Sequence, residues 1–272
     1  MANRFHQTSD KMRLHCFVAN LLWSIPLLSV PVRAQQGLAI ARPDFTDDIS
    51  YIHYSSMVRT ILDRDNNRYL ELDKTSDLSD GQLISIAFRA FEEMEDDDEL
   101  DDRDKPGAMI ALQTKGEIYL SSSIKNNDHG FMLQFPDSYA SIALERCSAA
   151  TAEEQAAEGA RDSGAVHRIG GNCGEPGAVH LFYRHNPGAE KGALPQPSRL
   201  VAVTRNSNSG AMRVIDPCDR YQSNDPEKPS DDARVWGCAR FVNDVNVRAI
   251  MRSTAAVAIP TGWIFYPDAA CL

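Results

Sequence analysis

The sequence predicts an α/β fold in which helices pack on a sheet, and three observations indicate it. A helix with an apolar stripe begins at Ser79, whose spacing to Gln82 makes a capping box. Two apolar segments flank a short turn at residues 114–116, which is typical of a β-hairpin. Two more helices, opening near Glu175 and Cys238, are each followed by an apolar strand. This order of elements predicts a sheet with helices packed on it.

Residues 1–34 have the pattern of a secretory signal peptide. An apolar run at residues 16–30 follows basic residues, and Val32-Arg33-Ala34 provides residues that a signal peptidase accepts. Asn20 and Pro26 interrupt this run, and no later stretch approaches the roughly 20 apolar residues that a membrane span needs. We therefore expect a signal peptide to be removed and the mature protein to be secreted, extracellular and without a membrane partner.

The charge balance argues against a long nucleic acid as a partner. The chain has 38 acidic and 28 basic residues and a formal net charge of −10. Such a surface repels a phosphate backbone, and the sequence has no cluster of Lys and Arg with interleaved aromatic residues. A small-molecule substrate is expected if the protein is an enzyme, and the sequence identifies no protein partner.

Residues 35–75 are predicted to form an N-terminal extension to one domain at residues 76–272. Within the extension, four apolar residues recur at roughly helical spacing: Ile49, Ile52, Met57 and Ile61. This spacing predicts one helix in the extension.

The first helix of the domain gives way to an acidic run at residues 92–104. This run lacks the alternating ligands and the central glycine of a calcium loop, so we interpret it as a solvated loop. The two hairpin strands are expected at residues 108–113 and 117–124. Residues 126–171 are weakly patterned, and the Ala/Glu-rich piece at 147–161 is compatible with either a helix or a mobile insertion.

Helices and strands alternate in the second half of the domain. The expected segments are, in order, a helix over residues 175–185, a buried strand at 200–204, a hydrophilic loop at 219–234, a helix that opens at Gly237, and strands at 247–251 and 263–266.

Cysteines stand at the start of the second and third helices. Cys173 and Glu175 open the second helix, where unpaired backbone N–H groups and the helix dipole stabilise a thiolate that can bind a metal or act as a nucleophile. Pro217-Cys218 and then Cys238 follow. This order resembles the zinc-dependent nucleoside and nucleobase deaminase superfamily, whose signature is His or Cys, x, Glu and later Pro-Cys-x-x-Cys. The resemblance implies a three-layer α-β-α fold, with helices on both faces of the sheet.

The second half of this motif departs from the family pattern. Tyr221 stands three residues after Cys218, where the family has its second cysteine. Cys238 is a replacement, because the family's downstream offsets from it fall on suitable residues: Val242, Asn246, Val247 and Ile250. Asn246 tolerates the left-handed turn that family members form with glycine. We therefore expect residues 219–237 to be an insertion inside the motif, and the resemblance covers residues 79–250.

The resemblance also implies the roles of the site residues. Cys173, Cys218 and Cys238 would bind Zn²⁺ and leave a fourth position to water, whose pKa the zinc lowers. Glu175 would take a proton from that water and pass it to the ring nitrogen and the departing amine. The implied activity is a hydrolytic deamination of a nucleobase, a nucleoside or a related amino-heterocycle.

The residues leave other interpretations open. Cys218 and Cys238 are compatible with a disulfide, which an oxidising export route favours, and Cys147 and Cys271 are compatible with another. Glu175 is also a favourable first-turn charge. Among the histidines near the motif, only His167 is kept as a reserve ligand. The alternative function is a non-catalytic, secreted interaction or effector protein on a disulfide-stabilised scaffold of the same kind.

Overall fold

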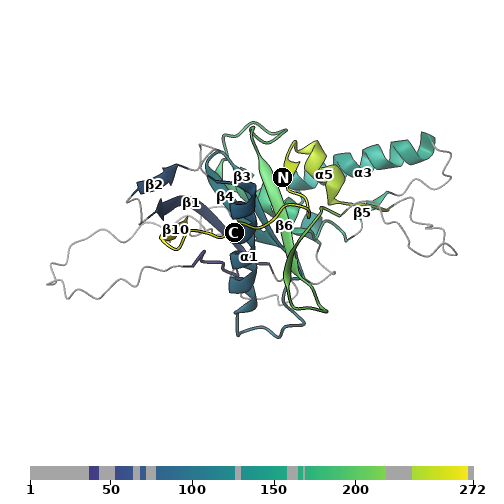
Figure 1. The fold of residues 1–272 in the computed structure, drawn as a ribbon. Helices are drawn as coiled ribbons and strands as arrows, with labels where there is room; N and C mark the ends of the chain where they lie inside the picture. The colour runs from purple at the N-terminus through teal and green to yellow at the C-terminus, as the bar shows by residue number, and fades with distance from the viewer. Residues whose placement is uncertain are drawn as a thin grey trace, which may run out of the picture. The chain divides into compact units, whose positions relative to one another are not determined.

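One mixed sheet lies between two helical layers, which gives a three-layer α-β-α architecture (Figure 1). The structure is a computed structural model and describes residues 37–42, 53–63, 68–71, 78–125, 130–157, 165–167, 169–218 and 235–268. The strands of the sheet are β1 (Ser55–Asp63), β2 (Arg68–Glu71), β3 (Met109–Thr114), β4 (Glu117–Ser122), β6 (Arg199–Arg205), β7 (Met212–Ile215), β9 (Arg248–Ala249) and β10 (Trp263–Asp268).

Their order is β10-β1-β4-β3-β6-β7, with β2 paired to β1 and β9 paired to β6. The pairs are antiparallel except for β6 and β9, which are parallel. A parallel pair needs a crossover connection, and the chain between β6 and β9 includes the helix α5 (Cys238–Asp244). This crossover places β9 beside β6 in the sheet. Cys238, one of the predicted metal ligands, is the first residue of α5.

The β3–β4 hairpin is at the centre of the sheet, as its sequence predicts. The two turn residues, Lys115 and Gly116, have φ angles of 47° and 72°, which match the primed turns that suit the twist of a hairpin. All six residues of β3 are buried, because helices cover both faces of the sheet. Met109 and Ala111 pack in the core on one face, whereas Ile110 and Leu112 pack in the core on the other.

The helix α1 (Asp80–Glu95) covers one face and packs against β3 and β6. Its capping box is present: the backbone N–H of Gln82 donates to the Ser79 hydroxyl, and the backbone N–H of Ser79 donates to the Gln82 side chain. The helix continues to Glu95, so the predicted loop at residues 92–104 is wrong for its first four residues. Those residues add a last turn whose Met94 side chain is buried, and apolar burial outweighs the repulsion among neighbouring carboxylates.

In the described part of the chain, four helices cover the opposite face. These helices are α2 (Phe131–Gln134), α3 (Tyr139–Ala157), α4 (Gly174–His185) and α5. The Ala/Glu-rich piece, whose composition allows either a helix or an insertion, is part of α3 as far as Ala157. Side chains of α3, α4 and α5 share one core cluster with β3 and β4, so the site residues on α4 and α5 are fixed to the sheet by packing.

The predicted helix in the N-terminal extension is wrong over residues 55–63, which form strand β1. This strand lies inside the sheet, between β10 and β4. Residues 53–58 are all buried, since the strand has neighbours along both edges and cores on both faces. A strand buried on both faces shows no two-residue alternation, so its apolar residues also fit a helical spacing.

Some of the sequence predictions concern residues outside the described ranges. These are the signal peptide at residues 1–34, the loop at 219–234 and the side chain of Cys271. None of the helices in the described part of the chain combines the length and the apolar content needed to cross a membrane. Secretion of the mature protein stays a prediction.

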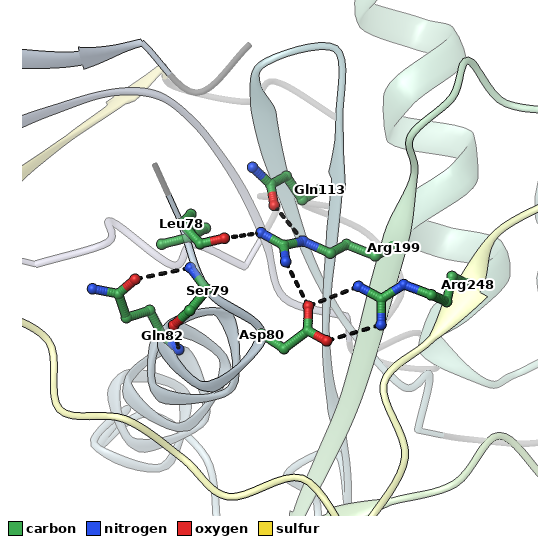
Figure 2. A network of polar contacts seen from close by, with 7 residues as sticks. All are labelled: Leu78, Ser79, Asp80, Gln82, Gln113, Arg199 and Arg248. Atoms are coloured by element: carbon green, nitrogen blue, oxygen red, sulfur yellow. Dashed lines mark hydrogen bonds and ion pairs between the residues drawn. The ribbon is translucent and has the colours of Figure 1, made fainter. Parts of the chain in front are cut away.

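A network of charged side chains ties the first turn of α1 to the sheet, as Figure 2 shows. Asp80 accepts hydrogen bonds from both Arg199 on β6 and Arg248 on β9, and the two bonds from Arg248 are 2.7 and 2.8 Å long. Arg199 also donates to the Gln113 side chain at 2.7 Å and to the carbonyl of Leu78. The Arg248 guanidinium, followed by that of Arg199, keeps the pKa of Asp80 below its usual value. Three elements that are distant in sequence therefore meet at one carboxylate.

We expect Asp80→Asn to lower the free energy of unfolding by about 1–3 kcal/mol, because it removes the charge that two guanidinium groups share in a partly buried position. Denaturant titration of both proteins measures this difference. Asp101→Asn is the matched control, since the Asp101–Arg103 pair is exposed and should change stability by less than about 0.5 kcal/mol. Equal effects of the two substitutions would contradict the anchoring role of Asp80.

Candidate metal centre

Three cysteines and one histidine converge where α4 and α5 begin. The ligand atoms of His167, Cys173, Cys218 and Cys238 all lie within 4.8 Å of one another. His167, Cys173 and Cys238 are buried, and Cys218 is half-buried. The group contains the three cysteines that were predicted as ligands and His167, which was predicted as a reserve ligand. Together these residues could hold a metal ion.

Cys173 is the N-cap residue of α4, and a tight loop delivers it there. Gly170 and Gly171 have φ angles of 62° and 81°, a conformation that side chains other than glycine rarely adopt. The next residue, Gly174, lies directly against β4: a Cβ atom added there would come within 2.6 Å of the Ser121 carbonyl oxygen. The absence of a side chain at Gly174 therefore lets the first turn of α4 approach the sheet, with Cys173 on one side and Glu175 on the other.

Cys218 and Cys238 come together although the predicted insertion separates them in sequence. The Cys218 carbonyl accepts a hydrogen bond from the backbone N–H of Ala239 at 2.9 Å, and the Cys218 sulfur accepts one from the backbone N–H of Cys238 at 3.1 Å. At the other end of α5, Asn246 has a φ of 56°. It turns the chain toward β9, as its offset from Cys238 predicts.

The sulfur atoms of Cys173 and Cys218 are 3.5 Å apart. Hydrogen bonds from the thiols of Cys173 and Cys238 to Cys218 place the pKa of Cys218 far below its usual value. The same contact with Cys218 raises the pKa of Cys173, and burial raises that of Cys238. These contacts favour the thiolate form at Cys218 and the thiol form at Cys173 and Cys238, and a bound metal would displace the protons of the latter two.

None of the cysteines in the described residues forms a disulfide: Cys147, Cys173, Cys218 and Cys238 are free thiols. The disulfide between Cys218 and Cys238 that the sequence left open is therefore wrong. The reason is geometric, because the Cys218 sulfur is engaged with the Cys173 sulfur and with the backbone N–H of Cys238. Three free thiols whose sulfur atoms lie within 4.8 Å of one another could hold a metal ion that prefers sulfur ligands.

Glu175 is the second residue of α4 and is buried, with 4% of its surface exposed. Burial, and next to it the negative charge of Cys218, raises the pKa of Glu175 to about 7. The residue lines a pocket with a volume of about 260 Å³, together with Cys173 and Cys218. A carboxyl group with a pKa near neutrality can both accept and release a proton at physiological pH.

This raised pKa predicts the pH dependence of stability in the metal-free protein. Between pH 4.5 and 7 the carboxyl of Glu175 ionises in the unfolded chain but stays protonated in the folded one, so the contribution of Glu175 to stability falls as the pH rises. Burial lowers the pKa of His53 and of His180, so these two groups contribute in the opposite direction and the Glu175 contribution is read as a difference between variants. The full difference is about 3 kcal/mol and is complete above pH 7. Urea unfolding measures this contribution as the difference in unfolding free energy between Glu175→Gln and the wild-type protein, which should shift in favour of the variant as the pH rises from 5 to 8. A parallel pH profile for the two would contradict the shift.

Two polar residues that line the pocket were not predicted from the sequence as part of the site. Ser123 and Asp216 line it together with the carboxyl of Glu175, whereas Ile110 and Ala202 provide apolar walls. Ser123 follows β4, and Asp216 follows β7 directly before Pro217-Cys218, but the motif itself did not predict that either residue lines a pocket. Only the pairing of the strands places both residues next to α4.

A larger cavity, of about 630 Å³, lies beside the C-terminal end of α1. Four of its six charged lining residues form ion pairs with one another: Lys105 with Asp102, and Arg205 with Glu95. The smaller pocket is the better candidate for chemistry, because it combines a raised carboxyl pKa with potential metal ligands.

Comparisons of the chain with protein-family models, with curated proteins and with solved structures find no match. What can be said of the site therefore comes from its own residues. These residues form a possible metal site of one histidine and three cysteines, in a mixed sheet with helices, and this arrangement is compatible with a deaminase-like fold.

Proposed function

We propose that the protein is a zinc-dependent hydrolytic deaminase that acts on a nucleobase, a nucleoside or a related amino-heterocycle. One observation carries the proposal: a buried glutamate with a pKa of about 7 lines the same pocket as two residues of a three-cysteine cluster. Deamination by hydrolysis needs an activated water and a group that moves protons between water, ring nitrogen and amine. The cluster and Glu175 would provide these two components.

Cys173, Cys218 and Cys238 would hold the metal ion. A bound zinc ion supplies a Lewis acid that makes water acidic enough to attack near neutral pH. The carboxylate of Glu175 accepts a proton from the attacking water. It delivers this proton to the ring nitrogen, then accepts the second proton from the hydroxyl group formed on the ring carbon and delivers it to the amine, which leaves as ammonia; a pKa near 7 favours transfer in both directions.

The pocket favours a small substrate. Its volume of about 260 Å³ is slightly below the range of about 300–1,000 Å³ that is usual for ligand sites, so it suits a single heterocyclic ring. Apolar side chains such as Ile110 and Ala202 would contact the ring faces, and Ser123 and Asp216 would offer hydrogen bonds to its polar edge. The net charge of −10 further disfavours a long polynucleotide as a substrate.

The proposal is tested by incubating the zinc-loaded protein with a panel of free bases and nucleosides, including cytosine, cytidine, adenine, adenosine, guanine and guanosine. Release of ammonia, together with the change in ultraviolet absorbance of the ring, would identify a substrate. A folded protein that binds one zinc ion per chain and releases no ammonia from any member of the panel would contradict the proposal.

A further inference from the structure

His167 lies in β5 (Val166–His167), which pairs with β8 (Val235–Trp236) immediately before Cys238. Its ring contacts the Trp236 ring edge-on, with 4.6 Å between the centroids. Only 7% of its surface is exposed. The ring is therefore fixed between β8 and the loop that leads to Cys173.

The two ring nitrogens of His167 have different partners. Nδ1 accepts hydrogen bonds from the backbone N–H of Gly171 at 2.9 Å and from that of Ile169 at 3.3 Å. Nε2 faces the sulfur of Cys238 at 3.4 Å. An N–H group can donate only to a nitrogen that carries no proton, so Nδ1 presents its lone pair and the ring proton is on Nε2. A flip of the ring would direct both backbone N–H groups at a carbon atom.

This tautomer is the opposite of the one that a metal ligand needs. A histidine that binds a metal through Nε2 has no proton there, and its Nδ1–H usually donates to a carbonyl or a carboxylate. In this protein backbone N–H groups surround Nδ1, so the Nε2–H of His167 points at Cys238.

We infer that His167 is not a fourth metal ligand but a positioning residue, whose Nε2–H donates a hydrogen bond to the Cys238 thiolate when the three cysteines bind a metal. The inference rests on the proposed function in so far as it assumes that the cluster binds zinc. It names the ligands that this chain supplies as Cys173, Cys218 and Cys238, without a fourth from His167.

The residues that line the pocket show how the hydrogen bond from His167 would affect the metal site. Cys173, Cys218 and Glu175 line the pocket, whereas neither His167 nor Cys238 does. The contact between His167 and Cys238 therefore lies outside the part of the cluster that lines the pocket. A hydrogen bond to a thiolate withdraws electron density from the sulfur, so a metal bound to Cys238 would be more electrophilic toward a ligand in the pocket.

Long-range ¹H–¹⁵N NMR of histidine-labelled protein tests the inference directly. We expect His167 to show a protonated Nε2 and an unprotonated Nδ1 both in the zinc-free and in the zinc-loaded protein, since Gly171 and Ile169 are present in both. A protonated Nδ1 with a metal-bound Nε2 in the zinc-loaded protein would overturn it.

Two substitutions separate a hydrogen-bond donor from a ligand. Glutamine can donate from its amide nitrogen but is a poor zinc ligand, so His167→Gln should bind zinc within about threefold of the wild-type affinity, whereas His167→Ala should bind about 10–100-fold more weakly. Competition with a chromophoric chelator measures both affinities. His180→Gln on α4 is the control for the loss of an imidazole, because His180 stacks on Phe135 with 4.4 Å between the centroids and is not in the cluster. If the Gln variant is weakened as much as the Ala variant, the inference is wrong.

The result is separable from the test of the proposed function. A protein that binds zinc with a protonated Nε2 at His167, yet deaminates nothing, would contradict the deaminase proposal and support the role of His167. A protein that deaminates a substrate while zinc is bound to Nε2 of His167 would support the deaminase proposal and contradict the role of His167. If no zinc binds, the deaminase proposal fails, and the zinc-free spectrum still decides which nitrogen carries the proton, with a protonated Nδ1 counting against the inference.

Discussion

Replacement of Glu175 by glutamine is expected to leave the fold and the metal content unchanged and to lower the rate of deamination by about 10²–10⁴-fold, the range for loss of a general acid–base. Glutamine has nearly the same shape as glutamic acid and fits the same buried position, but it cannot carry a proton between water and amine. The measurement is the initial rate of ammonia release by zinc-loaded wild-type and variant protein at equal metal content.

Glu153→Gln on α3 is the matched control, because Glu153 is an exposed carboxylate outside the pocket. It should retain the wild-type rate. If Glu175→Gln retained that rate as well, Glu175 would be no more than a buried first-turn charge at the N-terminus of α4, and the deaminase mechanism would have no proton carrier.

Replacement of Cys218 by serine is expected to abolish stoichiometric zinc binding. Cys218 is the residue whose sulfur contacts Cys173 and accepts from the backbone of Cys238, and a hydroxyl is a much poorer zinc ligand than a thiolate. Elemental analysis after dialysis against a chelator should give about one zinc per wild-type chain and almost none for the variant. Free zinc at about 1,000 times its dissociation constant should stabilise the wild-type protein by about 4 kcal/mol and the variant hardly at all.

Cys147→Ser provides the comparison for this experiment. Cys147 is a buried free thiol on α3 and is not a member of the metal cluster. The substitution can lower stability because it buries a hydroxyl, but it should leave one zinc per chain. Retention of zinc by Cys218→Ser, or loss of zinc by Cys147→Ser, would contradict the assignment of the cluster.

Elements with a strong local signal could be predicted from the sequence. The capping box at Ser79, the Lys115-Gly116 turn and the stop at Asn246 each depend on a few neighbouring residues, and the structure has all three. The signal for β1 was misleading, because a strand that is buried on both faces lacks the alternation that distinguishes it from a helix. For α3, local composition left the choice open, and packing on α4 and α5 decided it.

In the candidate site, too, some features depend on neighbouring residues and others on contacts between distant segments. The Cys173-x-Glu175 spacing at a helix start is local, so the sequence alone is enough to recognise it. That Cys218 meets Cys238 depends on the parallel pairing of β6 with β9 and on the α5 crossover, which are contacts between distant parts of the chain. The protonated nitrogen of His167 depends on the backbone N–H groups of Ile169 and Gly171, which a sequence does not orient.

By itself, the sequence determined the α/β class, the positions of the first helix and the central hairpin, and the chemical types available for a metal centre. Only the tertiary structure decided that Cys218 and Cys238 are free thiols in one cluster, that Glu175 has a pKa of about 7, and that β1 belongs to the sheet. The physical reason is how far apart in the sequence the interacting residues are. Capping and turn formation involve residues a few positions apart, whereas desolvation and ligand convergence depend on which distant segments pack around a side chain.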